Sequence, residues 1–447
     1  MNDKGAEAGL RLSCTERHVT RWENGEVRKP SADYATALIA LNAPCPQDAS
    51  VPRRSPSGWH SVEEPVRGGS DAVTISPAMS AQDCDRFLEA VGAAVIGSST
   101  DKLTPWLPSL PQSSCVPARV DGDDVAFIVS TTAGLRRQDQ RHGGATVVDM
   151  AAATMRASQG LLLGCKDHRT KTALAVALAD LARVAGWAYH DIGDHRRARQ
   201  YLTLAMLYAG TAGAPSLVAS ILYVLGRISL GDRRPQHALR MFQLGQVPAQ
   251  DAANNAESAR LHANAAWAHA MMGNERLMRE SLGRAEHELG RVDDKQIDPW
   301  TRVFFTPGEF TGLQSVIYNE MAATLHDDPA RSARYTSAAL DLIAHSLAAP
   351  LYARPTRSVL FDHITAAACQ FRLHETELAV ESARTALDMS SGILSARAVD
   401  RLRSIADPAA SIDHNDAREI RRRIRRLMHP QQEQQAMSAE SRTPSVG

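Results

Sequence analysis

The chain has 447 residues, and its 50 basic and 50 acidic side chains cancel to a formal charge of zero. Overall charge therefore cannot carry nucleic-acid binding, so any such contact must come from a local patch. Alanine occurs 71 times, whereas aromatic residues make up only 5% of the chain. Because alanine is the strongest helix former, this composition predicts an all-α protein with closely packed helices.

A helix-turn-helix pattern lies near the start of the chain, where residues 12–42 read LSCTERHVTRWENGEVRKPSADYATALIALN. Thr15 is a suitable N-cap for a helix whose apolar face is formed by Val19 and Trp22. Gly25 follows as a C-cap would. A short preceding helix, a tight turn and this helix together are typical of a helix-turn-helix unit. The alternative is a solvated surface helix of a small bundle.

The string VTRWENGEVRKPS within this segment resembles the recognition helix and following loop of Cro/CI-type (XRE-family) helix-turn-helix regulators. The order of parts also resembles actinobacterial members of that family, in which the domain precedes a linker, a short apolar helix and repeats similar to tetratricopeptide (TPR) repeats. The resemblance implies a transcription regulator that binds DNA as a homodimer at a palindromic operator. It places DNA contacts at Thr15, Glu16, Arg17, Thr20, Arg21, Asn24, Arg28 and Lys29.

These side chains would contact different parts of the DNA. The face with Arg17 and Arg21 would enter the major groove, where arginine can bond a guanine edge through two N–H groups. Thr15 and the helix N-terminus would hold a phosphate, and the residues after the helix would contact the backbone. Residues 11–30 carry a net charge of +2, which favours this interpretation only mildly.

One departure from the family pattern is that the first helix of the DNA-binding domain is missing, and the second begins almost at Met1. Three explanations stay open: the true start lies upstream, the domain has degraded, or the repeats or a dimer partner complete it. The second explanation leads to an alternative function. The chain would then be a TPR-like scaffold that binds a protein or peptide and no longer binds DNA.

Composition divides the rest of the chain. Residues 1–43 are expected to form the helix-turn-helix unit, and residues 44–117 a linker rich in proline and serine. Within this linker a short apolar helix is predicted near residues 81–97. Residues 118–429 show an almost uninterrupted helical pattern, and the polar residues 430–447 are predicted to be a disordered tail.

A regular repeat runs through the helical part, with equivalent small residues at positions 186, 226 and 266. Its small and bulky positions predict stacked helix hairpins, with the bulky residue filling the gap between neighbouring hairpins. The pattern resembles TPR repeats, although their usual period of about 34 residues is shorter. Turns are predicted at Gly-Asp or Gly-Asn pairs, and two irregular copies follow later. The aligned positions are Gly186, Tyr189, Ala198, Leu202 and Ala205; Gly226, Ser229, Ala238, Phe242 and Gly245; and Ala266, His269, Met278, Leu282 and Ala285.

A solenoid of this kind has a concave groove, which is the expected effector site. By analogy with peptide-responsive regulators, the effector would be a peptide, a protein or a small molecule. The predicted lining residues are Tyr189, Arg227, Asn264 and His269. The remaining alternative for the whole region is a generic alanine-rich helical bundle.

Other motifs carry weaker signals. The sequence HDIGDH at residues 190–195 could suggest a metal site, but its place between two helices favours polar turn chemistry, so no metal is expected. The basic segment 418–430 could touch DNA phosphates or an acidic partner, although a polar-faced cap that ends the solenoid is the favoured interpretation. No catalytic or nucleotide-binding motif occurs, and we therefore predict neither an enzyme nor a cofactor.

The expected location is the cytoplasm. The best apolar run, residues 87–97, is interrupted by Glu89 and is far shorter than a membrane-spanning helix, which needs about 20 apolar residues. No two of the six cysteines have the spacing of a zinc site or a redox pair, which predicts reduced thiols.

Overall fold

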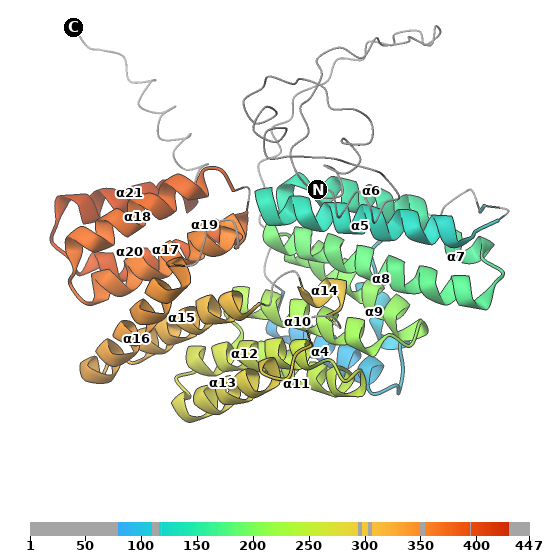
Figure 1. The fold of residues 1–447 in the computed structure, drawn as a ribbon, viewed down its shortest axis with the longest axis horizontal. Coiled ribbons are helices and arrows are strands. Elements are labelled where there is room, and N and C mark those ends of the chain that lie inside the picture. The colour runs from blue at the N-terminus through green and yellow to red at the C-terminus, as the bar shows by residue number, and fades with distance from the viewer. Residues whose placement is uncertain are drawn as a thin grey trace, which may run out of the picture. The chain divides into compact units, whose positions relative to one another are not determined.

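The computed structural model describes residues 79–109, 116–117, 119–293, 297–302, 306–348, 354–393 and 395–428. Within these ranges the chain forms helices and connecting turns and no strand, which confirms the all-α prediction there (Figure 1). The predicted helix-turn-helix unit of residues 1–43, all of its DNA-binding residues, and the predicted tail of residues 430–447 lie outside the described residues.

Five helix hairpins follow one another and pack in succession as an α-solenoid. They include the three hairpins predicted from the regular repeat and the two predicted from its irregular copies. The paired helices are α8 (His168–Asp191) with α9 (His195–Thr211), α10 (Pro215–Gly231) with α11 (Pro235–Asp251), α12 (Asn255–Met271) with α13 (Glu275–Leu289), α15 (Pro307–Thr324) with α16 (Pro329–Leu347), and α17 (Thr356–Arg372) with α18 (Thr376–Ser390).

The turns within and between the first three hairpins share one backbone feature. A residue with positive φ recurs at even intervals, at Gly193 (85°), Gly213 (61°), Arg233 (58°), Ala253 (50°) and Gly273 (70°). Such a residue ends a helix in the left-handed conformation, which glycine adopts without the steric cost that a Cβ imposes. The predicted turns are therefore confirmed, but in the second hairpin an arginine, and not the predicted glycine, takes the left-handed position.

Replacing Ala253 by glycine is expected to raise the free energy of unfolding by about 0.5–1 kcal/mol, because the left-handed strain outweighs the extra freedom of glycine in the unfolded chain. Ala253 is exposed, so no buried contact is lost. The matched control is Gly213→Ala in the turn between α9 and α10, which also joins two hairpins and should lower stability by a similar amount. Urea unfolding checks both, and a less stable Ala253→Gly chain would contradict the account.

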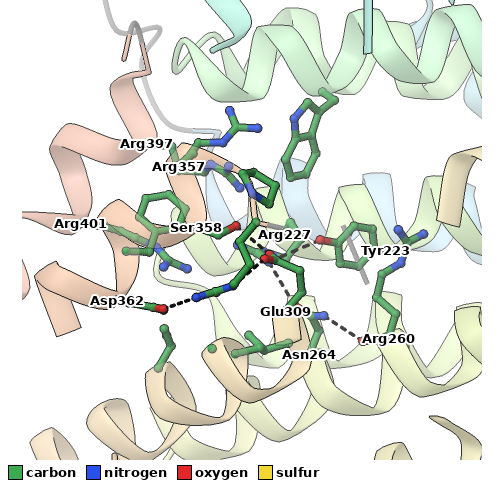
Figure 2. A pocket seen from close by; sticks show the side chains of 17 residues that line it. Tyr223, Arg227, Arg260, Asn264, Glu309, Arg357, Ser358, Asp362, Arg397 and Arg401 are labelled. Atoms are coloured by element: carbon green, nitrogen blue, oxygen red, sulfur yellow. Dashed lines mark hydrogen bonds and ion pairs between the residues drawn. The ribbon is translucent and has the colours of Figure 1, made fainter. Parts of the chain in front are cut away.

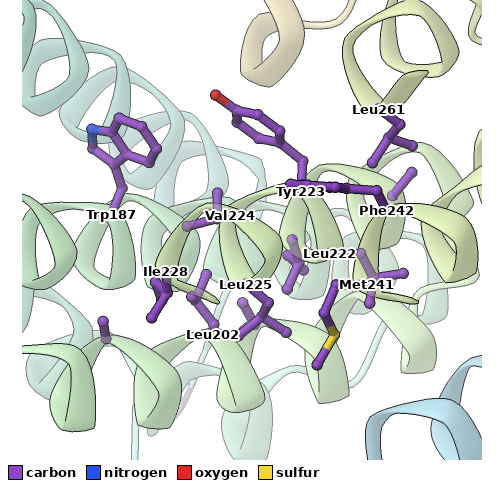
Figure 3. Packing of buried hydrophobic residues seen from close by; sticks show 14 of the residues in the cluster. Trp187, Leu202, Leu222, Tyr223, Val224, Leu225, Ile228, Met241, Phe242 and Leu261 are labelled. Atoms are coloured by element: carbon purple, nitrogen blue, oxygen red, sulfur yellow. The ribbon is translucent and has the colours of Figure 1, made fainter. Parts of the chain in front are cut away.

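The small and bulky repeat positions pack against each other inside each hairpin. A Cβ on Gly186 would lie 2.7 Å from Cγ of Leu202, and a Cβ on Gly226 would lie 2.7 Å from Cδ1 of Phe242. Small and bulky positions therefore meet within each of these hairpins. Between neighbouring hairpins, Leu261 approaches Gly245 of the preceding one, and Figure 3 shows the buried cluster.

Helices before the first hairpin pack onto the solenoid: α4 (Ala81–Val95), α5 (Gly122–His142), α6 (Val148–Ser158) and α7 (Leu161–Gly164), with the 3-10 helices η1 (Asp101–Trp106) and η2 (Gly144–Thr146). α4 contacts α11, and its Phe87 and Val91 belong to the main hydrophobic core together with Leu103 of η1. The short apolar helix predicted near residues 81–97 is therefore present as α4, and its apolar face is buried against the solenoid.

The C-terminal end consists of α19 (Ala396–Arg401), α20 (Arg403–Ala410) and α21 (Asn415–Met428), and α14 (Pro299–Arg302) lies in the predicted interruption of the array. α21 packs on α18 and α20 and buries Ile420 and Ile424 while its arginines face outward, as a cap would. Leu427 of the same helix is 41% exposed. No helix among the described residues has the length and apolarity to cross a membrane.

Candidate functional site: an arginine-lined pocket

A cavity of about 90 Å³ lies inside the solenoid, between α8, α10 and α12 on one side and α15, α17 and α19 on the other. Figure 2 shows Arg397 and Arg401 on one side of it and Tyr223 and Arg260 on the opposite side. We call this cavity the arginine pocket, because its lining includes six arginines: Arg227, Arg260, Arg354, Arg357, Arg397 and Arg401.

One wall of the pocket is held together by the buried carboxylate of Asp191 at the end of α8. Asp191 accepts hydrogen bonds from Oγ of Ser395 at 3.0 Å and from the backbone N–H of Gly144 at 2.8 Å. Its Oδ1 lies 3.0 Å from Nη1 of Arg357 and 3.2 Å from Nε of Arg397. Asp191 thereby connects α8 to η2, α17 and α19, segments that lie far apart in the sequence.

The charges around Asp191 stabilise its ionised form. Burial raises the pKa of the Asp191 carboxyl, but the positive charges of Arg357 and Arg397 lower it by more, so it lies below the ordinary value. Arg357 also donates to Asp139 of α5 at 3.1 Å. Burial lowers the pKa of the Arg357 guanidinium, but Asp191 and Asp139 raise it by more. The group is thus a buried network of ion pairs with matched charges.

Two further arginines of the pocket have carboxylate partners of their own. Arg260 is 1% exposed, and its Nε donates to Glu257 at 3.1 Å. Arg354 pairs with Asp362, and its Nε lies 3.3 Å from Glu309. These contacts fix the guanidinium groups on α12 and in the segment before α17.

Arginines and aromatic rings alternate along the pocket in one continuous row. Each guanidinium carbon lies 4.0–5.9 Å from the centroid of a neighbouring ring, which is the range of cation–π contacts. Such contacts hold the planar guanidinium groups in place and partly replace their lost hydration. In order, the members of this row are Trp187, Arg397, Phe361, Arg401, Trp267, Arg227, Tyr223 and Arg260.

Arg227 and Arg401 differ from the other four arginines in their partners. Among the described residues, no carboxylate lies within ion-pair distance of either guanidinium. Arg227 makes long contacts of 3.4 Å with two neutral groups, the hydroxyl of Tyr223 and Oδ1 of Asn264. Arg401 contacts the rings of Phe361 at 4.0 Å and Trp267 at 4.9 Å. Within the described part of the chain, the pocket therefore contains two positive charges without a directly bonded counterion.

Burial and neighbouring positive charges lower the pKa of two arginines of the pocket. Burial lowers the pKa of the Arg401 guanidinium, and the positive charges of Arg227 and Arg397 lower it further, to well below its ordinary range. Burial also lowers the pKa of Arg397, to about 10, although the negative charge of Asp191 opposes this. Both shifts mean that an additional negative charge in the pocket would be favourable.

Two of the four predicted effector residues, Arg227 and Asn264, line the pocket, whereas Tyr189 and His269 do not. Tyr189 stacks on Tyr201 of α9 with ring centroids 5.2 Å apart. Tyr189 and His269 occupy equivalent positions of the repeat, two residues after Trp187 and Trp267. Because successive residues of a helix are about 100° apart, this position turns away from the pocket.

The sequence contained a better signal. Trp187, Arg227 and Trp267 occupy the same position in three successive repeats, and all three belong to the row of arginines and rings. The other half of the pocket had no such signal, because Arg397 and Arg401 lie on α19, outside the regular hairpins.

The HDIGDH motif forms the turn between α8 and α9, where Nδ1 of His195 lies 2.5 Å from Asp232. No group of three metal-ligating side chains occurs among the described residues. No protein-family profile, curated protein or solved structure matches the chain. The pocket itself can bind and orient an anion, since its polar side chains are mostly fixed donors of hydrogen bonds.

Proposed function

We propose that the chain is a DNA-binding transcription regulator whose repeat domain receives an effector in the arginine pocket. The observation that carries the effector part is that six arginines, from α10, α12, α17, α19 and the segment before α17, line one cavity, and two of them lack a carboxylate partner among the described residues. Arginines that serve stability alone are normally paired, so two half-buried arginines without such a partner favour ligand binding.

The DNA-binding part rests on the sequence of residues 12–42 and its resemblance to XRE-family regulators. In this proposal Arg17 and Arg21 contact base edges in the major groove. Two copies of the chain bind a palindromic operator, because one recognition helix reads only a few base pairs. The effector changes the affinity for DNA through the repeat domain.

Replacing Arg17 or Arg21 by alanine is expected to lower the affinity for specific DNA at least tenfold, because each bidentate arginine–guanine contact contributes about 1–3 kcal/mol of discrimination. The measurement is a genome-wide DNA pull-down with the purified full chain, followed by binding titrations on the enriched duplexes at fixed salt. Arg276→Ala is the control, since this side chain on α13 is 74% exposed and pairs with Glu280 one turn away.

The control should enrich the same duplexes as the natural chain. Enrichment that persists in both Arg17→Ala and Arg21→Ala would remove the recognition-helix assignment. A chain that enriches no duplex at all would favour the alternative function, a helical-repeat scaffold for a protein or peptide.

A further inference from the structure

We propose that the arginine pocket binds a phosphate group through Arg227 and Arg401, and that this binding ties α19 to α10 and α12. The inference deepens the proposed function and rests on it in one respect, since the phosphate-bearing molecule would be the effector. The binding itself is a property of the repeat domain and can be measured without DNA.

The first argument is charge. Four arginines of the pocket are neutralised by carboxylates, namely Arg260, Arg354, Arg357 and Arg397. The remaining two, Arg227 and Arg401, together present a charge of +2, which a phosphate dianion matches. The nearest acidic influence on Arg401 is Glu320, which pairs with Arg233 at 3.7 Å and does not line the pocket.

The second argument is the geometry of the donors. The guanidinium carbon of Arg401 lies 4.0 Å from the ring centroid of Phe361, and that of Arg227 lies 4.7 Å from the ring centroid of Trp267. Contacts with rings use none of the N–H groups in hydrogen bonds, so the planar fork of donors stays available for an oxygen ligand. Edge N–H groups bind phosphate or carboxylate oxygens through two parallel hydrogen bonds.

The third argument is size. A cavity of about 90 Å³ accommodates a few water molecules or one compact ion, whereas pockets for drug-sized ligands start at about 300 Å³. The cavity therefore takes one compact group, and any larger part of a ligand would lie outside it. What fits is the phosphate of inorganic phosphate or of a small phosphate monoester.

Binding would have a structural consequence. Arg397 and Arg401 both lie on α19, a helix of six residues, and they face Trp187 of α8 and Trp267 of α12. Without an anion, Arg227, Arg397 and Arg401 repel one another across the pocket. A bound dianion removes this repulsion, so the ligand-bound solenoid resists unfolding more strongly.

The test uses the purified full chain in calorimetric and thermal-unfolding titrations with inorganic phosphate, glycerol phosphate and succinate at constant ionic strength. We expect saturable binding of both phosphate ligands and a rising unfolding midpoint, with succinate at least tenfold weaker. Arg227→Gln and Arg401→Gln should each weaken phosphate binding at least tenfold, and the exposed control Arg276→Gln should not. Arg401→Lys keeps the positive charge but loses the planar fork of N–H groups. Its affinity for phosphate should lie between those of Arg401→Gln and the natural chain.

A second readout separates binding from folding. Because Arg227→Gln and Arg401→Gln remove a repelling charge, their ligand-free unfolding midpoints should equal or exceed that of the natural chain, whereas residues with a purely structural role would lower it. The proposal is overturned if phosphate does not saturate, if both variants bind as the natural chain does, or if succinate alone binds. If the chain binds phosphate but enriches no DNA, the phosphate site is supported and the proposed regulator is contradicted. If it enriches DNA but does not bind phosphate, only the phosphate site is contradicted.

Discussion

Replacement of Asp191 by alanine is expected to lower the free energy of unfolding by about 3–5 kcal/mol, because it leaves Arg357 and Arg397 buried without their shared counterion. The matched control is Asp194→Ala in the turn that follows α8. Asp194 accepts a hydrogen bond from the backbone N–H of Arg197 as an N-cap, and its loss should cost about 1 kcal/mol. Urea unfolding followed by circular dichroism measures both losses.

The effect of Asp191 should also depend on pH in a defined direction. The pKa of the Asp191 carboxyl is lower in the folded chain than its ordinary value, since the two arginines outweigh the effect of burial. The stabilisation is therefore complete above the unfolded pKa, about 3.9, and is lost as the pH falls through the folded value. Natural chain and Asp191→Asn should differ most near neutral pH and converge in acid. An equal difference at all pH values, or a loss at Asp191 no larger than at Asp194, would contradict this account.

Gly226→Ala is the second substitution with a large expected effect, a loss of about 2–3 kcal/mol in the free energy of unfolding. The added Cβ would overlap the ring of Phe242, which is fully buried and cannot move away without disturbing its neighbours. The next hairpin shows the compatible pair, since Ala266 and Leu282 occupy the equivalent positions and are both buried.

This comparison supplies the control. Gly226→Ala combined with Phe242→Leu recreates the pair of the next hairpin, so the double variant should recover at least about 1 kcal/mol relative to the sum of the single losses. Thermal or urea unfolding of the three variants measures the coupling. Strictly additive losses would show that Gly226 and Phe242 do not pack as described.

The hairpins could be predicted because their packing is local in sequence. Small positions such as Gly186 and Gly226 recur at the repeat period, and each meets a bulky residue on the paired helix of its own hairpin, as with Leu202. A turn residue with left-handed backbone follows at a fixed distance. These regularities fix the hairpins without any knowledge of distant contacts.

Only the pocket residues on the regular hairpins could be predicted from the sequence. Arg227 and Asn264 lie on the regular hairpins, whereas Arg397 and Arg401 reach the site through contacts with rings that are distant in the sequence. Because α19 follows the last hairpin and lies outside the repeat, the repeat pattern does not indicate these contacts. The helix α4 could be predicted from its apolar face, whereas its partner α11 could not, because the two lie far apart in the sequence.

In the proposed regulator, the arginine pocket binds a phosphate group and thereby controls DNA binding. Its most direct test is a DNA-binding titration of the natural chain and Arg401→Gln on an enriched duplex, with and without glycerol phosphate at constant ionic strength. We expect glycerol phosphate to change the DNA affinity of the natural chain at least fivefold, which is the lower end of typical allosteric coupling. The DNA affinity of Arg401→Gln should not change when the ligand is added. Equal responses of the two chains, or no response in the natural chain, would contradict it.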